Sequence, residues 1–293
     1  MAGLFFRLRP ADSLNLAFLF FLLVISAVFH QRIGGAPSLP ALYAALILFQ
    51  AVLIRIKDKG VFYGWVYDLI FPTISILFVF DSLGRLVHSL NPKDIDPILI
   101  HLDYMLFSGN PTVMMEKITV PLLTDVMQLA YTSYYFLPIT FGVVLKVKKD
   151  DAAFGRSIFL IMLCFYLSYV GYLLMPALGP RFTLNHLQHT ELKGFLIAGP
   201  LQELLNRLEG IKRDAFPSGH TGVALTVLYL AFQFEKRLFR LFLPFVLALI
   251  FSTVYLRYHY VVDVFAGVLL ALITILIGEK YYGCREKRVG LNS

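Results

Sequence analysis

The sequence predicts an all-α membrane protein, a polytopic bundle of about eight transmembrane helices. Hydrophobic residues make up 58% of the 293 residues, charged residues make up 15%, and the mean hydropathy is +0.72. An ordinary soluble domain is far less apolar than this. The apolar residues also gather in runs long enough to cross a hydrocarbon core of about 30 Å. We therefore expect an integral protein of the plasma or inner membrane.

The eight apolar runs alternate with short polar stretches. In chain order they cover 14–29, 39–53, 66–80, 120–145, 158–175, 221–234, 241–255 and 261–277. Asp125, Tyr131 and Ser168 fall inside or between the later runs, and polar residues there favour helices that pack against one another rather than against lipid. Arg7 and Arg9 precede the first run, so a cleaved secretory signal peptide is its alternative reading; we expect a retained helix.

The runs and the connections between them divide the chain into four parts. We expect N-terminal transmembrane helices over 1–90, an interfacial connection over 91–119, a catalytic membrane domain over 120–280 and a cytoplasmic tail over 281–293. Within the connection, residues 101–111 mix aromatic and polar side chains, which is typical of a segment lying along the membrane interface.

The positive charges predict an orientation. With eight spans, both termini and the loops after even-numbered helices share one face, and most of the 26 lysines and arginines lie there. Such a bias marks the cytoplasmic side. The net charge of +7 serves this orientation and anionic lipid headgroups, so it indicates no nucleic-acid partner.

Two short motifs follow on the opposite, extracytoplasmic face. Residues 215–221 read AFPSGHT and residues 257–263 read RYHYVVD. Ser218 and Gly219 directly precede a predicted helix whose first N–H groups are unpaired and whose dipole favours an anion, so this turn is a candidate phosphate cradle. Either histidine alone would be an ordinary interfacial residue, but the pair at one face predicts a site.

The remaining polar residues predict phosphoryl-transfer chemistry. His259 and Asp263 are four residues apart, which on a helix places them on one face. A carboxylate that holds one imidazole nitrogen leaves the other free to attack phosphorus. His220 is the candidate general acid and base. The loop 176–218 can fold back and bring Arg181 to the same place.

Arg181 and Arg257 are the candidate phosphate-binding cations, because one guanidinium can bind two phosphate oxygens. Lys212 and Arg213 are expected to be ordinary loop charges. A metal site made of His220, His259 and Asp263 is an alternative reading of the three residues. No further Cys/His cluster accompanies it, so no metal and no cofactor are expected.

These residues resemble the type 2 phosphatidic acid phosphatase superfamily of membrane lipid phosphatases and phosphotransferases. The resemblance covers roughly residues 120–280. Residues 217–220 match the family's PSGH motif in full, and Ser252, His259 and Asp263 match its last motif at the family spacing. The resemblance implies that His259 forms a phosphohistidine, that Asp263 orients it and that His220 is the general acid and base. It also implies a core of six membrane spans and no metal requirement.

The chain departs from the family pattern at three positions. Leu174 stands where the family usually has lysine, Phe182 replaces the proline after Arg181, and Thr253 replaces the arginine after the motif serine. Two expected phosphate ligands are therefore missing. We expect Arg257 to take over part of their role.

One branch of the family resembles this chain more than the others. A pattern in the connection is similar to that of inositol phosphorylceramide synthases; it comprises Asp103, Leu106, Phe107, Gly109 and Pro111. Residues 259–264 are also similar to sphingomyelin synthases. Members of both groups pass a phospho-headgroup to an alcohol rather than to water. The prediction is therefore a phosphotransferase that moves a phosphoryl or phospho-headgroup from a membrane lipid to an alcohol.

Two alternatives stay open. A lipid phosphate phosphatase acting on phosphatidate-like or polyprenyl diphosphate lipids would use the same motifs, because water can resolve the same phosphohistidine. A lipid transporter or scramblase would use the same helices, although the paired broken helices of two repeated halves are not visible.

Overall fold

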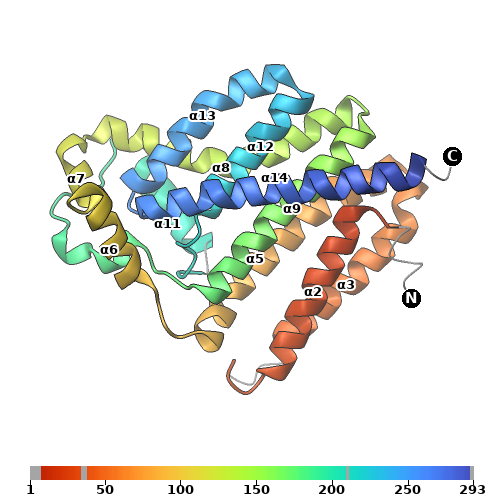
Figure 1. Cartoon of the computed structure of the whole chain (residues 1–293), viewed down its shortest axis with the longest axis horizontal. Coiled ribbons are helices and arrows are strands. Elements are labelled where there is room, and N and C mark those ends of the chain that lie inside the picture. The colour runs from red at the N-terminus through yellow and green to blue at the C-terminus, as the bar shows by residue number, and fades with distance from the viewer. Residues whose placement is uncertain (1–7, 34–37, 209–210, 291–293) are drawn as a thin grey trace.

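The fold-class prediction is confirmed by the computed structural model, which describes residues 8–33, 38–208 and 211–290. Arg7 and residues 291–293 of the expected tail lie outside these ranges. Throughout the described ranges the secondary structure is helical, and eight long helices follow the eight predicted runs (Figure 1). They are α2 (Pro10–Val28), α3 (Ser38–Ile56), α5 (Phe71–Leu90), α8 (Pro121–Val147), α9 (Asp151–Leu174), α12 (Gly219–Phe234), α13 (Lys236–Tyr255) and α14 (Val261–Gly290).

Six helical segments in the described ranges are long and apolar enough to cross a membrane. The third of these joins α4 (Val61–Trp65), a π-helical turn (Val66–Ile70) and α5. Two of the long helices, α8 and α12, are not among the six. With 16 residues, α12 is shorter than a full span, and the other helices surround it. The protein is therefore an integral membrane protein with a polytopic helical bundle.

The third predicted run ended too early. The run was expected to stop at residue 80, but α5 continues to Leu90. The apolar pattern breaks there because polar residues on α5 face a neighbouring helix: the Ser82 hydroxyl lies 2.7 Å from that of Tyr43, and Arg85 donates to Ser38. Hydrogen bonds between helices satisfy these groups without ending the helix.

Buried polar side chains attach the N-terminal helices to the rest of the bundle. Asn15 of α2 donates to Gln50 of α3 at 2.7 Å and accepts from Ser75 of α5 at 2.9 Å, while Tyr166 of α9 also contacts it. Apolar surfaces gain little by association inside lipid, so such bonds and close packing hold helices together there.

Ion pairs mark one end of the bundle. Asp68, at the start of the third segment, binds Arg9 before α2 and Lys146 at the end of α8. Arg156, near the start of α9, forms an ion pair with Glu279 in the later part of α14. The first turn of α2 and the last turns of α14 therefore share one side of the bundle.

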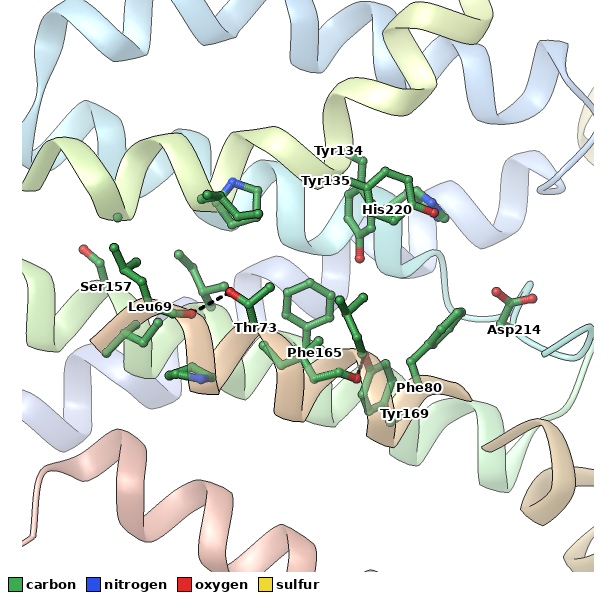
Figure 2. Close-up of a pocket in the computed structure, with 18 of the residues that line it drawn as sticks. Leu69, Thr73, Phe80, Tyr134, Tyr135, Ser157, Phe165, Tyr169, Asp214 and His220 are labelled. Carbon is green, nitrogen blue, oxygen red and sulfur yellow. Dashed lines mark hydrogen bonds between the residues drawn. The ribbon is translucent and has the colours of Figure 1, made fainter. Parts of the chain in front are cut away.

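The opposite end, where α12 and α14 begin, is covered by short helices (Figure 1). These elements are α6 (Asp96–Phe107), α7 (Pro111–Met114), the 3-10 turn Met115–Ile118, α10 (Pro180–Thr183), the 3-10 turn Asn185–Leu187 and α11 (Ala198–Leu208). Deeper in the bundle, α8 on one side and α5 and α9 on the other enclose an apolar cavity (Figure 2). Helix α14 continues to Gly290, through the first ten residues of the tail expected at 281–293.

Candidate active site

His259 lies in the turn between α13 and α14, and its ring is fixed by a backbone carbonyl. Its Nδ1 is 2.7 Å from the carbonyl oxygen of Ala215, and the residue is only 3% exposed. A carbonyl oxygen only accepts hydrogen bonds, so Nδ1 carries a proton, and in the neutral ring the lone pair is then on Nε2. The nucleophile chosen from the sequence is thus in the tautomer that nucleophilic attack requires.

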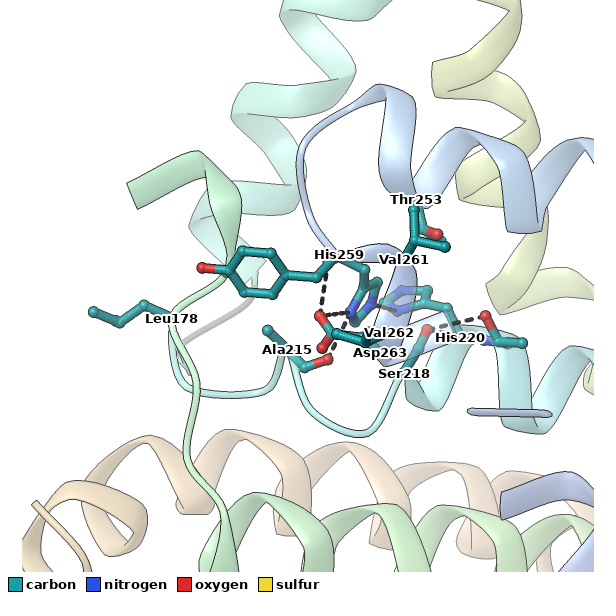
Figure 3. A network of polar contacts seen from close by, with 12 residues as sticks. Leu178, Ala215, Ser218, His220, Thr253, His259, Val261, Val262 and Asp263 are labelled. Atoms are coloured by element: carbon teal, nitrogen blue, oxygen red, sulfur yellow. Dashed lines mark hydrogen bonds and ion pairs between the residues drawn. The ribbon is translucent and has the colours of Figure 1, made fainter. Parts of the chain in front are cut away.

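His220, from the first turn of α12, faces this lone pair. Its Nδ1 lies 3.4 Å from Nε2 of His259 (Figure 3). The ring packs against Tyr131 and Tyr134, with ring centres 4.6 and 4.2 Å away. Its other nitrogen, Nε2, is buried and has no hydrogen-bond partner among the described residues. The structure therefore brings together two histidines that are 39 residues apart in sequence.

The expected geometry of Asp263 was wrong in one respect. His259 and Asp263 do not share a helical face, because α14 begins only at Val261 and His259 precedes it. Oδ2 of Asp263 accepts from the amide of Tyr260 at 2.8 Å and lies 3.6 Å from Nδ1 of His259. The carboxylate shapes the turn and contributes its charge to the ring, while the Ala215 carbonyl is the nearer partner.

Ser218 and Gly219 form the start of α12, as the sequence predicts. The Ser218 hydroxyl accepts from the amide of Thr221 at 3.3 Å, a typical N-cap, and the Ser218 amide donates to the carbonyl of Asp263 at 3.1 Å. Ser218 is fully buried. Its polar groups therefore join the two motifs to each other.

Gly219 is packed so closely that a larger residue should disturb the turn. A Cβ atom there would overlap the hydroxyl of Tyr172. We expect Gly219→Ala to destabilise the protein by about 1–3 kcal/mol, and Tyr172→Phe in the same chain to recover part of this by removing the hydroxyl. Thermal unfolding in detergent measures both. Gly155→Ala is the matched control, since no atom lies within 4 Å of a Cβ there; an equal loss in the control would contradict the overlap.

Both histidines face a cavity of about 290 Å³, which we call the active-site cavity. Arg181 reaches it from the turn after α9, and its guanidinium carbon lies 5.7 Å from the centre of the Tyr258 ring. The loop before α12 adds Lys212 and Asp214. The other lining residues are Tyr131, Leu178, Phe182, Ile211, Ala215 and Tyr258. The cavity therefore combines two cationic side chains with the nucleophile candidate, as an anionic substrate requires.

Lys212 and Arg213 are adjacent in the loop before α12, but their side chains have different surroundings, which the sequence did not predict. Lys212, expected to be an ordinary loop charge, lines the active-site cavity. Its neighbour Arg213 is paired instead with Asp94 at 2.7 Å. No pattern in the sequence distinguishes these two adjacent cations, because only the path of the loop decides which one faces inward.

Arg257 is held by the protein rather than directed at the histidines. Its backbone has a φ of 66°, and its guanidinium binds Glu116 at 2.9 Å, the carbonyl of Thr190 at 2.6 Å and Gln188 at 3.2 Å. Burial lowers the pKa of Arg257 and the Glu116 carboxylate opposes that shift. Arg257 does not line the active-site cavity. It anchors the loop after α10, whereas Arg181 and Lys212 supply charge to the cavity.

Two aspartates of α6 hold the loops that carry the site, and neither was among the predicted site residues, although Asp103 belongs to the pattern similar to inositol phosphorylceramide synthases. Asp96 accepts from the amides of Leu178 and Gly179 at 2.9 and 2.8 Å and from the hydroxyl of Tyr260 at 2.8 Å. Asp103 accepts from the first amides of α14 at 3.0 and 2.9 Å. Burial raises the pKa of Asp103 and these amides lower it. Their spacing of seven residues, which places both on one helical face, was the available signal.

The alternative metal site is not formed. Across the residues that the structure describes, no group of three histidine, cysteine or acidic side chains is arranged to hold a metal ion.

Comparison with known proteins agrees with this geometry. The sequence profile of the PAP2 superfamily matches residues 99–277. A PA-phosphatase related-family protein of Dictyostelium discoideum is 24% identical over 190 residues, which is 58% of this chain and 34% of that protein. The chain thus spans about a third of the length of this relative. No solved structure matches the chain. Because the profile covers more than half of the sequence and includes both histidine motifs, the chain belongs to the PAP2 superfamily.

Proposed function

We propose that the protein is a lipid phosphotransferase that moves a phosphoryl or phospho-headgroup from a membrane lipid to an alcohol through a phosphohistidine on His259. One observation carries the proposal. Nε2 of His259 lies 3.4 Å from Nδ1 of His220, in a cavity that is also lined by Arg181 and Lys212. This arrangement holds a nucleophile, a proton donor and two cations around one volume.

The reaction runs in two balanced steps. The Nε2 lone pair of His259 forms a bond to phosphorus while the bond from phosphorus to the lipid oxygen breaks, and His220 gives a proton to that oxygen. The acceptor alcohol then gives its proton to His220, its oxygen bonds to phosphorus, and the nitrogen–phosphorus bond breaks. Arg181 and Lys212 balance the charge on the phosphoryl oxygens in both steps.

A second cavity supports an alcohol acceptor. It has a volume of about 560 Å³ and shares Arg181 with the active-site cavity. Three amide side chains line it, from Asn185, Gln188 and Gln202. Gln188 is already bonded to Arg257 and to the carbonyl of Pro180. Amides donate to and accept from hydroxyl groups, so a polyol or headgroup alcohol would find partners in Asn185 and Gln202. We place this end of the bundle on the extracytoplasmic side, following the positive charges of the loops.

A lipid phosphate phosphatase is the second candidate. The name of the Dictyostelium relative favours it, since the same phosphohistidine would be resolved by water. The two candidates differ only in the acceptor of the second step, which is an alcohol for the phosphotransferase and water for the phosphatase.

Product analysis separates the candidates. Purified protein in lipid vesicles receives phosphatidate or phosphatidylinositol with a labelled phosphate, together with diacylglycerol, ceramide or inositol. We expect labelled alcohol product to exceed free labelled phosphate by about tenfold with the preferred acceptor. Free phosphate alone, unchanged by every acceptor, would instead assign the phosphatase. The double variant His220→Ala/His259→Ala is the control for both candidates, because it should form neither the labelled alcohol product nor free labelled phosphate.

A further inference from the structure

An apolar cavity of about 190 Å³ adjoins the active-site cavity. It lies between α8 on one side and α5 and α9 on the other (Figure 2). Hydrocarbon and aromatic side chains make up most of its wall, among them Ile76 of α5, Pro138 of α8, and Ile158 and Phe165 of α9. A cavity of this composition suits a hydrocarbon ligand.

The apolar cavity is continuous with the catalytic residues at one end. His220 and Asp214 line both cavities. In Figure 2 these two side chains lie at one end of the space, and Leu69 and Ser157 lie at the other. The ionisable groups therefore meet only one end of a bound molecule, and the rest of that molecule is surrounded by apolar groups.

The edge of the cavity faces the bilayer. Leu77 of α5 and Ile139 of α8 both line it, and they are 50% and 41% exposed. Exposed apolar side chains on a membrane-spanning bundle contact lipid. A lipid chain can thus enter sideways between α5 and α8 without crossing water.

The wall formed by α5 lies outside the residues that the PAP2 profile matches. The PAP2 profile begins at residue 99, whereas α5 ends at Leu90. Pro72, Ile76 and Phe80 of α5 line the cavity at intervals of four residues, which places them on one helical face. The N-terminal helices therefore shape the space next to His220.

We propose that this cavity holds one hydrocarbon chain of the lipid whose phosphate His259 attacks, and that α5 thereby makes the enzyme selective for long chains. The inference rests on the proposed function of the site. Along α9 the lining runs from Tyr172 to Phe154, a rise of about 27 Å at 1.5 Å per residue, and Ile158 lies about 21 Å along it. At about 1.25 Å per bond, an 18-carbon chain spans about 21 Å and an eight-carbon chain about 9 Å. Only the longer chain reaches Ile158.

A bulky residue about 21 Å along the cavity tests this length relation. Ile158→Trp should lower kcat/KM for an 18-carbon donor by about tenfold or more and leave an eight-carbon donor within about twofold. Leu167→Trp is the matched control, because Leu167 is on α9 but does not line the cavity; both donors should react as in the unmodified protein. Equal loss for both donors, or the same long-chain loss in the control, overturns the inference. A rate that depends on the chain length of the acceptor, rather than on that of the donor, also overturns the inference.

A binding measurement keeps this inference separate from the proposed function. Octadecyl phosphonate should raise the melting temperature of the unmodified protein and of Leu167→Trp more than octyl phosphonate does, and Ile158→Trp should lose this difference. Absence of turnover on every donor would reject the proposed function while this shift still supports the chain site. Equal shifts by both phosphonates in the unmodified protein reject the chain site whatever the activity.

Discussion

Replacing His259 by alanine should lower turnover by about 10⁴-fold or more, because no other described side chain of the active-site cavity is placed to take over the attack on phosphorus. The fold should survive, since the change removes the hydrogen bond to the Ala215 carbonyl and the contact with His220, a loss of about 1–3 kcal/mol. Phosphate release and transfer to alcohol should fall together. Both reactions pass through the same covalent intermediate.

Trapping the intermediate gives the sharper measurement. With a phosphate-labelled donor and an acid quench that is brief enough to spare a nitrogen–phosphorus bond, label should remain on the unmodified protein and be absent from His259→Ala. His186→Ala is the matched control, because His186 is an exposed histidine in the turn after α10, and it should keep both label and turnover. Full turnover in His259→Ala, with the protein intact, would reject His259 as the nucleophile.

Replacing Asp96 by alanine should give the largest loss of stability among the side chains around the site. The change removes the acceptor of two backbone amides and of the Tyr260 hydroxyl. Tyr260 keeps Thr183 as a partner, but the amides of Leu178 and Gly179 lose theirs. An orphaned buried donor costs about 1–3 kcal/mol, so we expect a total of about 2–6 kcal/mol.

Two measurements distinguish this role from a general surface effect. The melting temperature of Asp96→Ala should fall by about 5 °C or more, and turnover should fall with it, because the released loop carries Arg181. Asp94→Ala is the matched control two residues away. Asp94 forms a partly exposed ion pair with Arg213, and such pairs contribute about 0–1 kcal/mol. If both variants melt alike, Asp96 does not hold the loop.

The fold could be predicted because each membrane-spanning helix is visible in the sequence as a run of apolar residues. All eight apolar runs became helices. Two of them ended too early: α14 continues past residue 277 to Gly290, and α5 continues past residue 80, where Ser82 and Arg85 face another helix. Hydropathy cannot distinguish a polar residue that ends a span from one that bonds across an interface.

The site was only partly predictable. The motif spacing identified the two histidines that meet in the structure, and the start of α12 at Gly219 follows from the N-cap residue Ser218. Contacts between distant segments could not be derived from spacing. Examples are the pairing of Arg257 with Glu116, the Ala215 carbonyl at His259 and the inward path of Lys212.

The bond from His259 to the carbonyl of Ala215 has a consequence for genetics. Every amino acid carries a backbone carbonyl oxygen. A mutational scan changes only side chains, so it cannot remove the Ala215 carbonyl that sets the tautomer of His259. Ala215→Gly or Ala215→Ser would leave that oxygen in place. Substitutions that break this contact are therefore expected at other positions, where the new side chain bends the main chain of residues 215–217.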